Sequence, residues 1–343
     1  MGRRAALLSG IVSLVTAATL TGSVGAAAGT VVGAVACGGG TYQAEAVRNG
    51  NTWTAPGYSG TDMLSAMRAA VGSLPSDRTA KAGVLVRGSG DVPGDQSLDL
   101  PSYTMIDFCG TINVTGPARA GHAPLRTRNT TDVEIRNASL TGTPHFGILV
   151  RNGTDITMGQ IDMDLSGGLG VRIDNHDDRD ARSRNVRIGD VRVSGGGSHA
   201  VETYGVDGLT IGTVTARGTG ESGLQLNDTV NARIGRVDGE GTGADTGYAA
   251  FRMGNRDGRI GDGYPTNIRV GEVIARGGGR GILCVPESGG AVIDRITISR
   301  AGGDAILVED CRNVRLAARS SAVDEPGDVR IGAGPEPVTS LSR

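Results

Sequence analysis

Hydrophobic and polar residues alternate in short runs that recur along most of the chain between Gly121 and Arg315. Three of the clearest runs begin at His145, Ser198 and Glu221, and they read HFGILVRNGTDITMGQI, SHAVETYGVDGLTIGTV and ESGLQLNDTVNARIGRV. Each contains a small residue, a short apolar alternation, a turn of Asn, Asp or Gly, and a second alternation. Period two bounded by turn residues indicates strands, and no run is long enough for a helix. The pattern therefore predicts short strands throughout.

The alternating runs recur at a regular interval, which is typical of a repeat architecture. We place eight repeats, starting at positions 122, 145, 168, 198, 221, 247, 279 and 303, so the intervals run from 23 to 32 residues. The longer intervals contain extra loop residues at 175–184 and 255–265. Short strands stacked about 4.8 Å apart, one repeat on the next, would form a parallel solenoid. The apolar residues predicted to stack inside its sheet are Val171, Ile173, Val201, Leu224, Leu226, Ile282 and Ile306.

Asparagines recur at one turn of the predicted repeat, as Asn129, Asn152 and Asn175. Side-chain amides stacked in this way can hydrogen-bond from one repeat to the next. We expect a ladder of these three residues that stabilises the turn.

The repeat pattern resembles that of the right-handed parallel β-helix proteins of the pectin lyase-like superfamily, over most of residues 40–318. The resemblance implies an all-β fold, a right-handed parallel β-helix of about eight to ten coils with a short capping helix at its amino-terminal end. A helix is also indicated by the N-cap at Asp62 and the amphipathic spacing from Met63 to Val71. We divide the chain into a signal peptide at 1–28, a cap with the first strands at 37–110, a β-helix at 111–318, and a partly disordered tail at 319–343.

The amino-terminal segment and the cysteines both indicate export. Met1-Gly-Arg-Arg precedes an apolar, alanine-rich run that ends near Ala28, as in a secretory signal peptide, with a membrane anchor as the alternative. No other hydrophobic span follows, so we expect a secreted, extracellular protein that does not contact a membrane after cleavage. Four cysteines allow three pairings. We favour Cys37 with Cys109, and Cys284 with Cys311, because the last two fall on neighbouring repeats.

Composition narrows the class of partner. Glycine supplies 58 of 343 residues and aromatic residues only 3%, which suits tight turns around a narrow aliphatic core. The net charge of −2 implies no general attraction to nucleic acid or to membranes. The family resemblance implies an extended polysaccharide as the partner, and we expect the chain to act as a monomer.

Alternation along a strand places every second side chain on the outside of the sheet. The predicted outward pairs are Arg126/Arg128, Leu149/Arg151, Arg172/Asp174, Glu202/Tyr204, Gln225/Asn227, Phe251/Met253, Leu283/Val285 and Leu307/Glu309. His199 stands just before the Glu202 strand, and Tyr248 takes the same place two repeats later. The pattern predicts a functional groove centred on residues 168–228. The alternative is a solvent-exposed face that is merely polar.

The leading hypothesis is a lyase that cleaves a uronate-containing polysaccharide by β-elimination. Arginines on successive strands could bind uronate carboxylates and make the neighbouring C5 proton more acidic. His199 would act as the base near its ordinary pKa, and Tyr204 as the proton donor. The predicted catalytic residues are His199, Tyr204, Glu202, Arg172 and Asp174, and the predicted substrate-binding residues are Arg126, Arg128, Arg151, Gln225, Asn227 and Tyr248. A surface network of arginines and aspartates explains the same pattern equally well.

Two other functions fit the same residues. Asp174 and Glu202 could serve as the carboxylate pair of a glycoside hydrolase. Gly197-Ser198-His199-Ala200 is similar to the histidine element of polygalacturonases, but Gly168-Leu169 stands where their aspartate pair would be and no Arg-Ile-Lys follows. The chain could also be a carbohydrate-binding or adhesive β-helix without catalysis.

An acidic loop after Asp174 offers the one candidate metal site. Asp177, Asp178 and Asp180 supply carboxylate oxygens, which are the ligands that Ca²⁺ prefers. Their spacing matches no EF-hand, and a solvated acidic loop is the alternative. Calcium is therefore the only cofactor that we consider.

Overall fold

The computed structural model describes residues 36–175, 178, 180–317, 319–323 and 329–331. The expected signal peptide at 1–28 lies outside these residues. Within them the chain is all-β, with one helix and 24 strands that belong to a single, largely parallel sheet. Among the described residues, no helix has the length and apolar character needed to cross a membrane.

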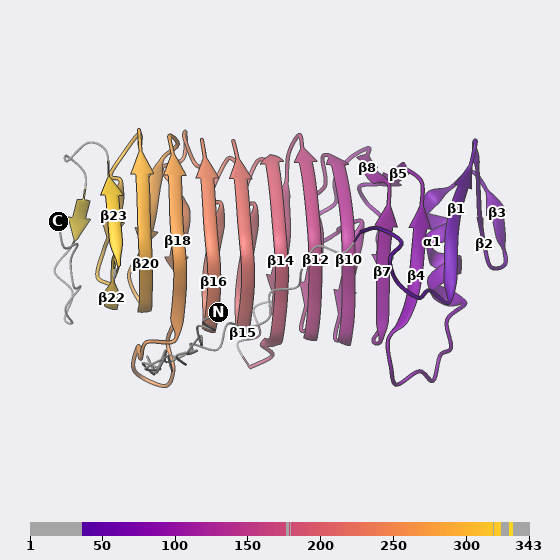
Figure 1. Ribbon diagram of the computed structural model, residues 1–343, viewed down its shortest axis with the longest axis horizontal. Coiled ribbons are helices and arrows are strands. Elements are labelled where there is room, and N and C mark those ends of the chain that lie inside the picture. Colours follow the sequence, from indigo (N-terminus) through magenta and orange to yellow (C-terminus); the bar gives the residue numbers. More distant parts are fainter. Residues whose placement is uncertain (1–35, 176–177, 179, 318, 324–328, 332–343) are drawn as a thin grey trace, which may run out of the picture. The chain divides into compact units, whose positions relative to one another are not determined.

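Most strands fall into two series in which each strand pairs in parallel with its counterpart in the next repeat. The long series comprises β1 (Ala44–Asn49), β4 (Ala82–Arg87), β7 (Thr104–Cys109), β10 (Thr131–Gly142), β12 (Thr154–Leu165), β14 (Ser183–Gly195), β15 (Val201–Arg217), β16 (Leu224–Glu240), β18 (Ile268–Arg276), β20 (Gly289–Ser299), β22 (Arg312–Arg315) and β23 (Ser320–Val323). Figure 1 shows most of these strands side by side in chain order.

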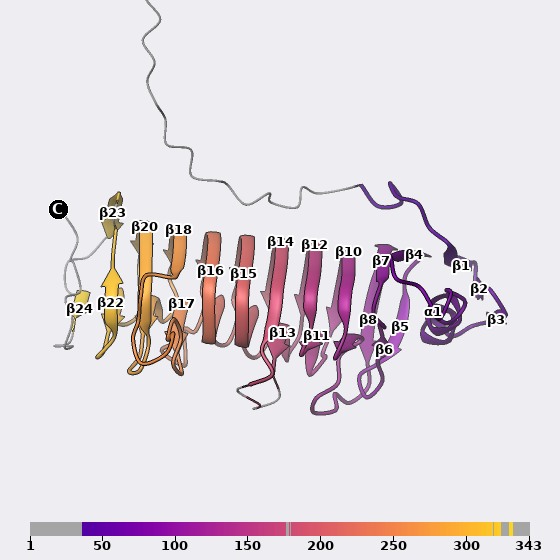
Figure 2. The same ribbon diagram turned by 90° about the horizontal axis from the view of Figure 1, so that it is seen from below.

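The short series carries the predicted site. It comprises β6 (Leu98–Asp99), β9 (Leu125–Arg128), β11 (Phe146–Arg151), β13 (Leu169–Asp174), the first residues of β15 and β16, β17 (Ala249–Gly254), β19 (Arg280–Cys284), β21 (Ile306–Val308) and β24 (Val329–Ile331). Figure 2 shows β11, β13 and β17 below β12, β14 and β18. The remaining strands are β2 (Thr52–Ala55), β3 (Tyr58–Gly60), β5 (Gly90–Pro93) and β8 (Thr111–Thr115). Of these, β2 and β3 form antiparallel pairs beside β1.

The register follows the intervals predicted from the sequence. Ile148 pairs with Val171, Val171 with Val201, and Val201 with Leu224, which reproduces intervals of 23, 30 and 23 residues. All seven residues predicted to stack inside the sheet are at most 2% exposed. Stacked repeats that share one continuous apolar core are the arrangement expected of a β-helix. Parallel pairing already begins at β1, within the segment expected to be the cap, and β23 and β24 extend it into the expected tail.

The single helix, α1 (Met63–Gly72), covers the amino-terminal end of the core. It begins where the sequence predicts, because the Asp62 carboxylate accepts a hydrogen bond from the Ser65 N–H at 2.6 Å. Its apolar face, which includes Leu64 and Met67, joins the same hydrophobic cluster as the strands. The helix therefore covers apolar side chains that the first repeat would otherwise expose to water.

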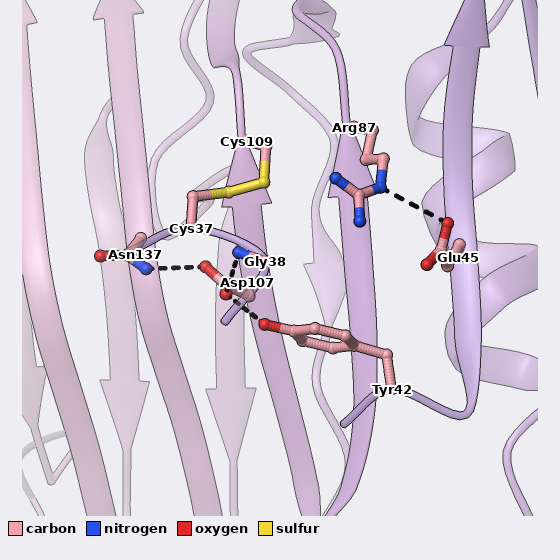
Figure 3. Close-up of a disulfide and its surroundings, with 8 residues drawn as sticks. All are labelled: Cys37, Gly38, Tyr42, Glu45, Arg87, Asp107, Cys109 and Asn137. Carbon is pink, nitrogen blue, oxygen red and sulfur yellow. Dashed lines mark hydrogen bonds and ion pairs between the residues drawn. A yellow bond between two sulfur atoms is a disulfide. The ribbon is translucent and has the colours of Figure 1, made fainter. Parts of the chain in front are cut away.

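Both predicted disulfides are present, with Cα atoms 5.5 Å apart for Cys37–Cys109 and 6.3 Å apart for Cys284–Cys311. Figure 3 shows how the first one fastens the chain before β1 against β7. The Asp107 carboxylate accepts hydrogen bonds there from the Gly38 N–H at 3.2 Å, the Tyr42 hydroxyl at 2.5 Å and the Asn137 amide. A covalent bond and a buried carboxylate thus hold the same segment.

The predicted asparagine ladder forms over one step only. Asn152 donates its side-chain amide to the Asn129 oxygen at 3.2 Å. Asn175 is buried, and neither of its amide atoms has a hydrogen-bond partner among the described residues. The next repeat has Gly205 at this place, with φ of 72°, and a Cβ there would collide with the Asn175 amide. The ladder therefore stops before Asn175, and Gly205 prevents a further asparagine in the following repeat.

Candidate functional site

The short series aligns polar side chains of successive strands on its outer surface, which we call the outer face. Pairing places Arg172 beside Glu202, Glu202 beside Gln225, and Gln225 beside Arg252. A second column runs from Arg128 through Arg151 to Asp174. The predicted neighbours from β9 to β16 are thus confirmed.

The prediction for β17 was wrong by one residue. Phe251 is fully buried and pairs with Leu224, so Phe251 and Met253 face the core and Arg252 faces outward. A shift of one residue along a strand exchanges its two faces. The signal in the sequence was Phe251 itself, since a large apolar side chain continues the column of buried leucines better than Arg252 does.

Most of the arginines predicted to bind uronates are already neutralised by carboxylates. Arg126 makes two hydrogen bonds to Asp99, at 2.6 and 2.8 Å. Arg151 makes two to Asp174, at 2.5 and 2.8 Å. Arg172 lies between Asp174, at 3.3 Å, and Glu202, to which its Nη1 donates. The ladder of free guanidinium groups is therefore absent from the centre of the outer face, and the arginine–aspartate network is present.

Asp174 is unsuited to the catalytic role that we predicted. It is 3% exposed. Burial raises the pKa of its carboxyl, but the hydrogen bonds and charges of Arg151 and Arg172 outweigh this effect and lower the pKa below the ordinary value. Asp174 is thus ionised, paired twice and closed to substrate. It anchors Arg172 rather than reacting.

Glu202 has the opposite properties. Its side chain is 13% exposed, and it accepts hydrogen bonds from Arg172 and from the Asn227 amide, the latter at 3.1 Å. Burial raises the pKa of Glu202 above its ordinary value, in spite of Arg172, and the nearby charge of Glu221 adds to the rise. Glu202 therefore keeps its proton to a higher pH than an exposed glutamate does.

His199 is neither exposed to solvent nor a base near its ordinary pKa, so that prediction was wrong. It is 6% exposed, and its Nδ1 accepts a hydrogen bond from the Ser222 N–H at 3.0 Å. Burial, helped by the charges of Arg252 and Arg172, lowers the pKa of His199 to about 3. The ring is therefore neutral, with its proton on Nε2. That nitrogen lies 3.0 Å from Glu221 Oε2 and 3.9 Å from Glu202 Oε1.

Gln225 and Asn227, predicted to bind substrate, are each 1% exposed. Gln225 donates to the Asn227 oxygen at 2.7 Å, and Asn255 donates to the same oxygen at 2.7 Å. These bonds orient the Asn227 amide toward Glu202. The two residues therefore position the carboxylate and are too deeply buried to bind a polymer.

Aromatic rings flank the carboxylates. The Arg172 guanidinium lies 5.6 Å from the Tyr204 ring centre and 5.9 Å from that of Phe146. Tyr248 packs edge-on against His199, with ring centres 5.5 Å apart, and the Arg252 guanidinium lies 5.0 Å from its ring. Stacked rings of this kind hold the arginines in place.

Glu221 and Arg252 were not among the residues predicted from the sequence. The Glu221 side chain is 28% exposed and also accepts a hydrogen bond from the Ser198 hydroxyl at 2.5 Å. Among the described residues, Arg252 has no carboxylate within 4.0 Å, and its Nε is buried without a hydrogen-bond partner. Glu221 lies in a turn and not in a strand. Alternation therefore does not predict which way its side chain points.

The acidic loop gives no support to calcium. Asp177 lies outside the described residues, and Asp178 accepts a hydrogen bond from the Asp180 N–H at 3.0 Å, as in an ordinary turn. Within the described part of the chain, no group of three or more His, Cys, Asp or Glu side chains could hold a metal ion.

Comparison of the chain with protein-family models, with curated proteins and with solved structures finds no match. The site must therefore be interpreted from its own geometry.

Proposed function

We propose that this protein is an extracellular enzyme that hydrolyses an extended polysaccharide, built on a right-handed parallel β-helix like those of the pectin lyase-like superfamily. The two stacked series of strands and the shared core support the fold. Two disulfides support an oxidising compartment. An outer face that continues from strand to strand suits a long polymer.

The observation that carries the proposal is the pair formed by Glu202 and Glu221 around His199. One imidazole nitrogen lies 3.9 Å from an oxygen of the first and 3.0 Å from an oxygen of the second, so these oxygens are at most about 7 Å apart. Carboxylate pairs of retaining glycosidases lie about 5–5.5 Å apart, and those of inverting enzymes about 6.5–9.5 Å. The upper bound allows the spacing of a retaining pair and reaches only the lower edge of the inverting range.

The two carboxyl groups have different environments, as an acid and its partner require. Glu202, whose pKa is raised, is the general acid that protonates the glycosidic oxygen. Glu221, the more exposed, either deprotonates the attacking water or attacks the anomeric carbon itself. In both cases water adds across the broken bond and one new reducing end forms. The neutral His199, whose Nε2 lies 3.0 Å from Glu221 Oε2, keeps this carboxylate beside Glu202.

Elimination is the second candidate, and Arg252 is the observation that favours it. This arginine has no carboxylate partner among the described residues and stacks on Tyr248 beside the pair. A uronate carboxylate bound there would be neutralised, and a tyrosine hydroxyl would have to remove the C5 proton.

The test is a panel of neutral and acidic polysaccharides with two readouts, reducing ends and the ultraviolet absorbance of unsaturated sugars. We expect reducing ends without absorbance. Glu202→Gln and Glu221→Gln should each lower the rate by roughly 10²–10⁴-fold. Glu240→Gln, at the far end of β16, is the matched control and should keep the wild-type rate. Absorbance would establish the lyase, and binding without any product would establish a non-catalytic module.

A further inference from the structure

A groove lined by arginines lies at the amino-terminal end of the outer face. This groove, of about 980 Å³, is bounded by the end of α1, by residues 97–103 and by the end of β9. This volume lies at the upper end of the range for small-molecule sites. Arg128 connects the groove to the outer face, since β9 lies three strands before β15, which carries Glu202. Three strand spacings are roughly 14 Å.

Three arginines line this groove, and each binds only neutral oxygen atoms. Arg68 donates to the Ser97 carbonyl at 3.0 Å and to a glutamine side chain. Arg78 donates to two backbone carbonyls and a threonine hydroxyl at 2.7–3.0 Å. Arg128 donates to the Gly121 carbonyl at 3.0 Å. The described part of the chain places no carboxylate within 4.0 Å of any of the three.

The only acidic residue in the lining, Asp99, is already occupied by Arg126. Within the described residues, the groove therefore contains three arginines without an ion-pair partner within 4.0 Å. Burial, followed by the charges of Arg126 and Arg151, lowers the pKa of Arg128. Burial, followed by the charges of Arg119, Arg126 and Arg128, lowers the pKa of His122.

The groove also has a donor without a partner and an apolar floor. Ser97 is 6% exposed, and its hydroxyl has no hydrogen-bond partner among the described residues. Buried hydroxyls are normally paired, so an empty one in a groove points to a ligand. Leu98 and Leu100, each 1% exposed, form part of the floor together with Val71.

We propose that this groove binds the carboxylate of an acidic saccharide. Guanidinium groups pair with carboxylates through two parallel hydrogen bonds, the Ser97 hydroxyl can bond a sugar hydroxyl, and the apolar floor suits the C–H face of a sugar ring. The saccharide part of this inference rests on the proposed function. The groove would then bind an acidic sugar unit roughly 14 Å from the point of cleavage, which is three strand spacings. It would select acidic polymers over neutral ones.

The test is calorimetric titration of the full chain carrying Glu202→Gln, so that binding is measured without turnover. The probes are an oligomer of glucuronate or galacturonate, a neutral glucose oligomer of equal length, and inorganic phosphate and sulfate. We expect the uronate oligomer alone to bind well. Arg128→Gln should weaken it about tenfold or more, because a charge-assisted bond is lost. Arg187→Gln, on the exposed side of β14, is the matched control and should change nothing.

Several results would overturn the inference. Equal binding of the neutral oligomer would show that charge does not determine recognition. Equal binding of phosphate or sulfate would show that the groove binds anions without recognising a saccharide. Unchanged affinity in both Arg128→Gln and Arg78→Gln, with melting temperatures like the parent, would place the ligand elsewhere. If reducing ends form from a polysaccharide but no uronate binds, the groove assignment fails while the hydrolase proposal stands.

Discussion

The centre of the outer face and the amino-terminal groove both contain arginines, but the partners differ. In the centre, Arg151 and Arg172 meet the carboxylates of Asp174 and Glu202. In the groove, Arg78 donates only to carbonyl and hydroxyl oxygens, and Arg68 and Arg128 likewise bind neutral acceptors. The central arginines hold the buried Asp174 in place, and Arg172 lowers the pKa of Glu202. The groove arginines have no carboxylate partner, so their charge can attract an anionic ligand.

The comparison shows that an arginine in a column of outward residues is not evidence of anion binding. A guanidinium group that already pairs with a carboxylate has little attraction left for a second one. What distinguishes a binding arginine is the neutral character of the oxygens that hold it in place. Among the described outward residues of the short series, Arg128 meets this criterion, and Arg252 is held by the Tyr248 ring with no carboxylate within 4.0 Å.

The largest expected effect is on stability, from Asp174→Asn. The change removes the carboxylate that pairs with Arg151 and one of the two that pair with Arg172 in a largely buried network, and we expect a loss of about 3 kcal/mol. This is the low end for a broken buried pair, since both guanidinium groups keep some contact with water. Asp99→Asn is the control, because it breaks a bond of the same geometry whose carboxylate side chain is 62% exposed. It should cost no more than about 1 kcal/mol. Equal losses in urea unfolding would contradict the distinction.

The acid sensitivity of the protein should depend on the same carboxylate. The pKa of Asp174 is lowered in the folded state, so the stability that it contributes is present above the unfolded value of about 3.9. That stability is lost as the pH falls through the folded pKa. Unfolding measured from pH 5 downward should therefore be steeper in the wild type than in Asp174→Asn. The groove arginines do not titrate in this range, so Arg128→Gln should follow the wild-type curve.

A third effect separates the two regions by kinetics. Arg172 lowers the pKa of Glu202 against the larger effect of burial. Since the general acid must be protonated, activity falls as the pH rises through this pKa. Arg172→Gln should move the alkaline limb of the pH–rate profile to higher pH. Arg128→Gln should raise KM on a uronate polymer and leave the limb in place. A shifted limb in both variants would mean that the two regions are one electrostatic unit.

The fold could be predicted from the sequence because the alternation that specifies each strand is local and recurs in every repeat. Val171, Val201 and Leu224 occupy the same place in alternating runs, so each repeat confirmed the register of its neighbours. The predicted register failed at Phe251, in the first strand after the turn at 242–246. Period two has only two phases, so one misjudged loop residue reverses a strand.

The site could be predicted less well, because partners depend on three dimensions. Alternation along the strand predicted that Arg172 and Asp174 face outward. It could not predict that Arg151, from the preceding repeat, pairs with Asp174 and covers it. His199 is buried through contacts with Ser222 and Tyr248, which come from later repeats. Residues in turns have no alternation to place them, and both His199 and Glu221 are such residues.

The smallest expected effect concerns Asp99, on β6 at the groove. It lines the groove, and its carboxylate forms an ion pair with Arg126. Asp99→Asn should release Arg126 and add one free positive charge at the edge of the groove. Because the Asp99 carboxylate is exposed, water and salt screen most of the difference, and we expect the affinity for a uronate oligomer to rise only roughly twofold. Titration at low and high salt should show this gain shrinking as the ionic strength increases. A loss of affinity would instead mean that Asp99 itself binds the sugar, and then the groove would recognise hydroxyl groups through an acid as well as carboxylates through arginines.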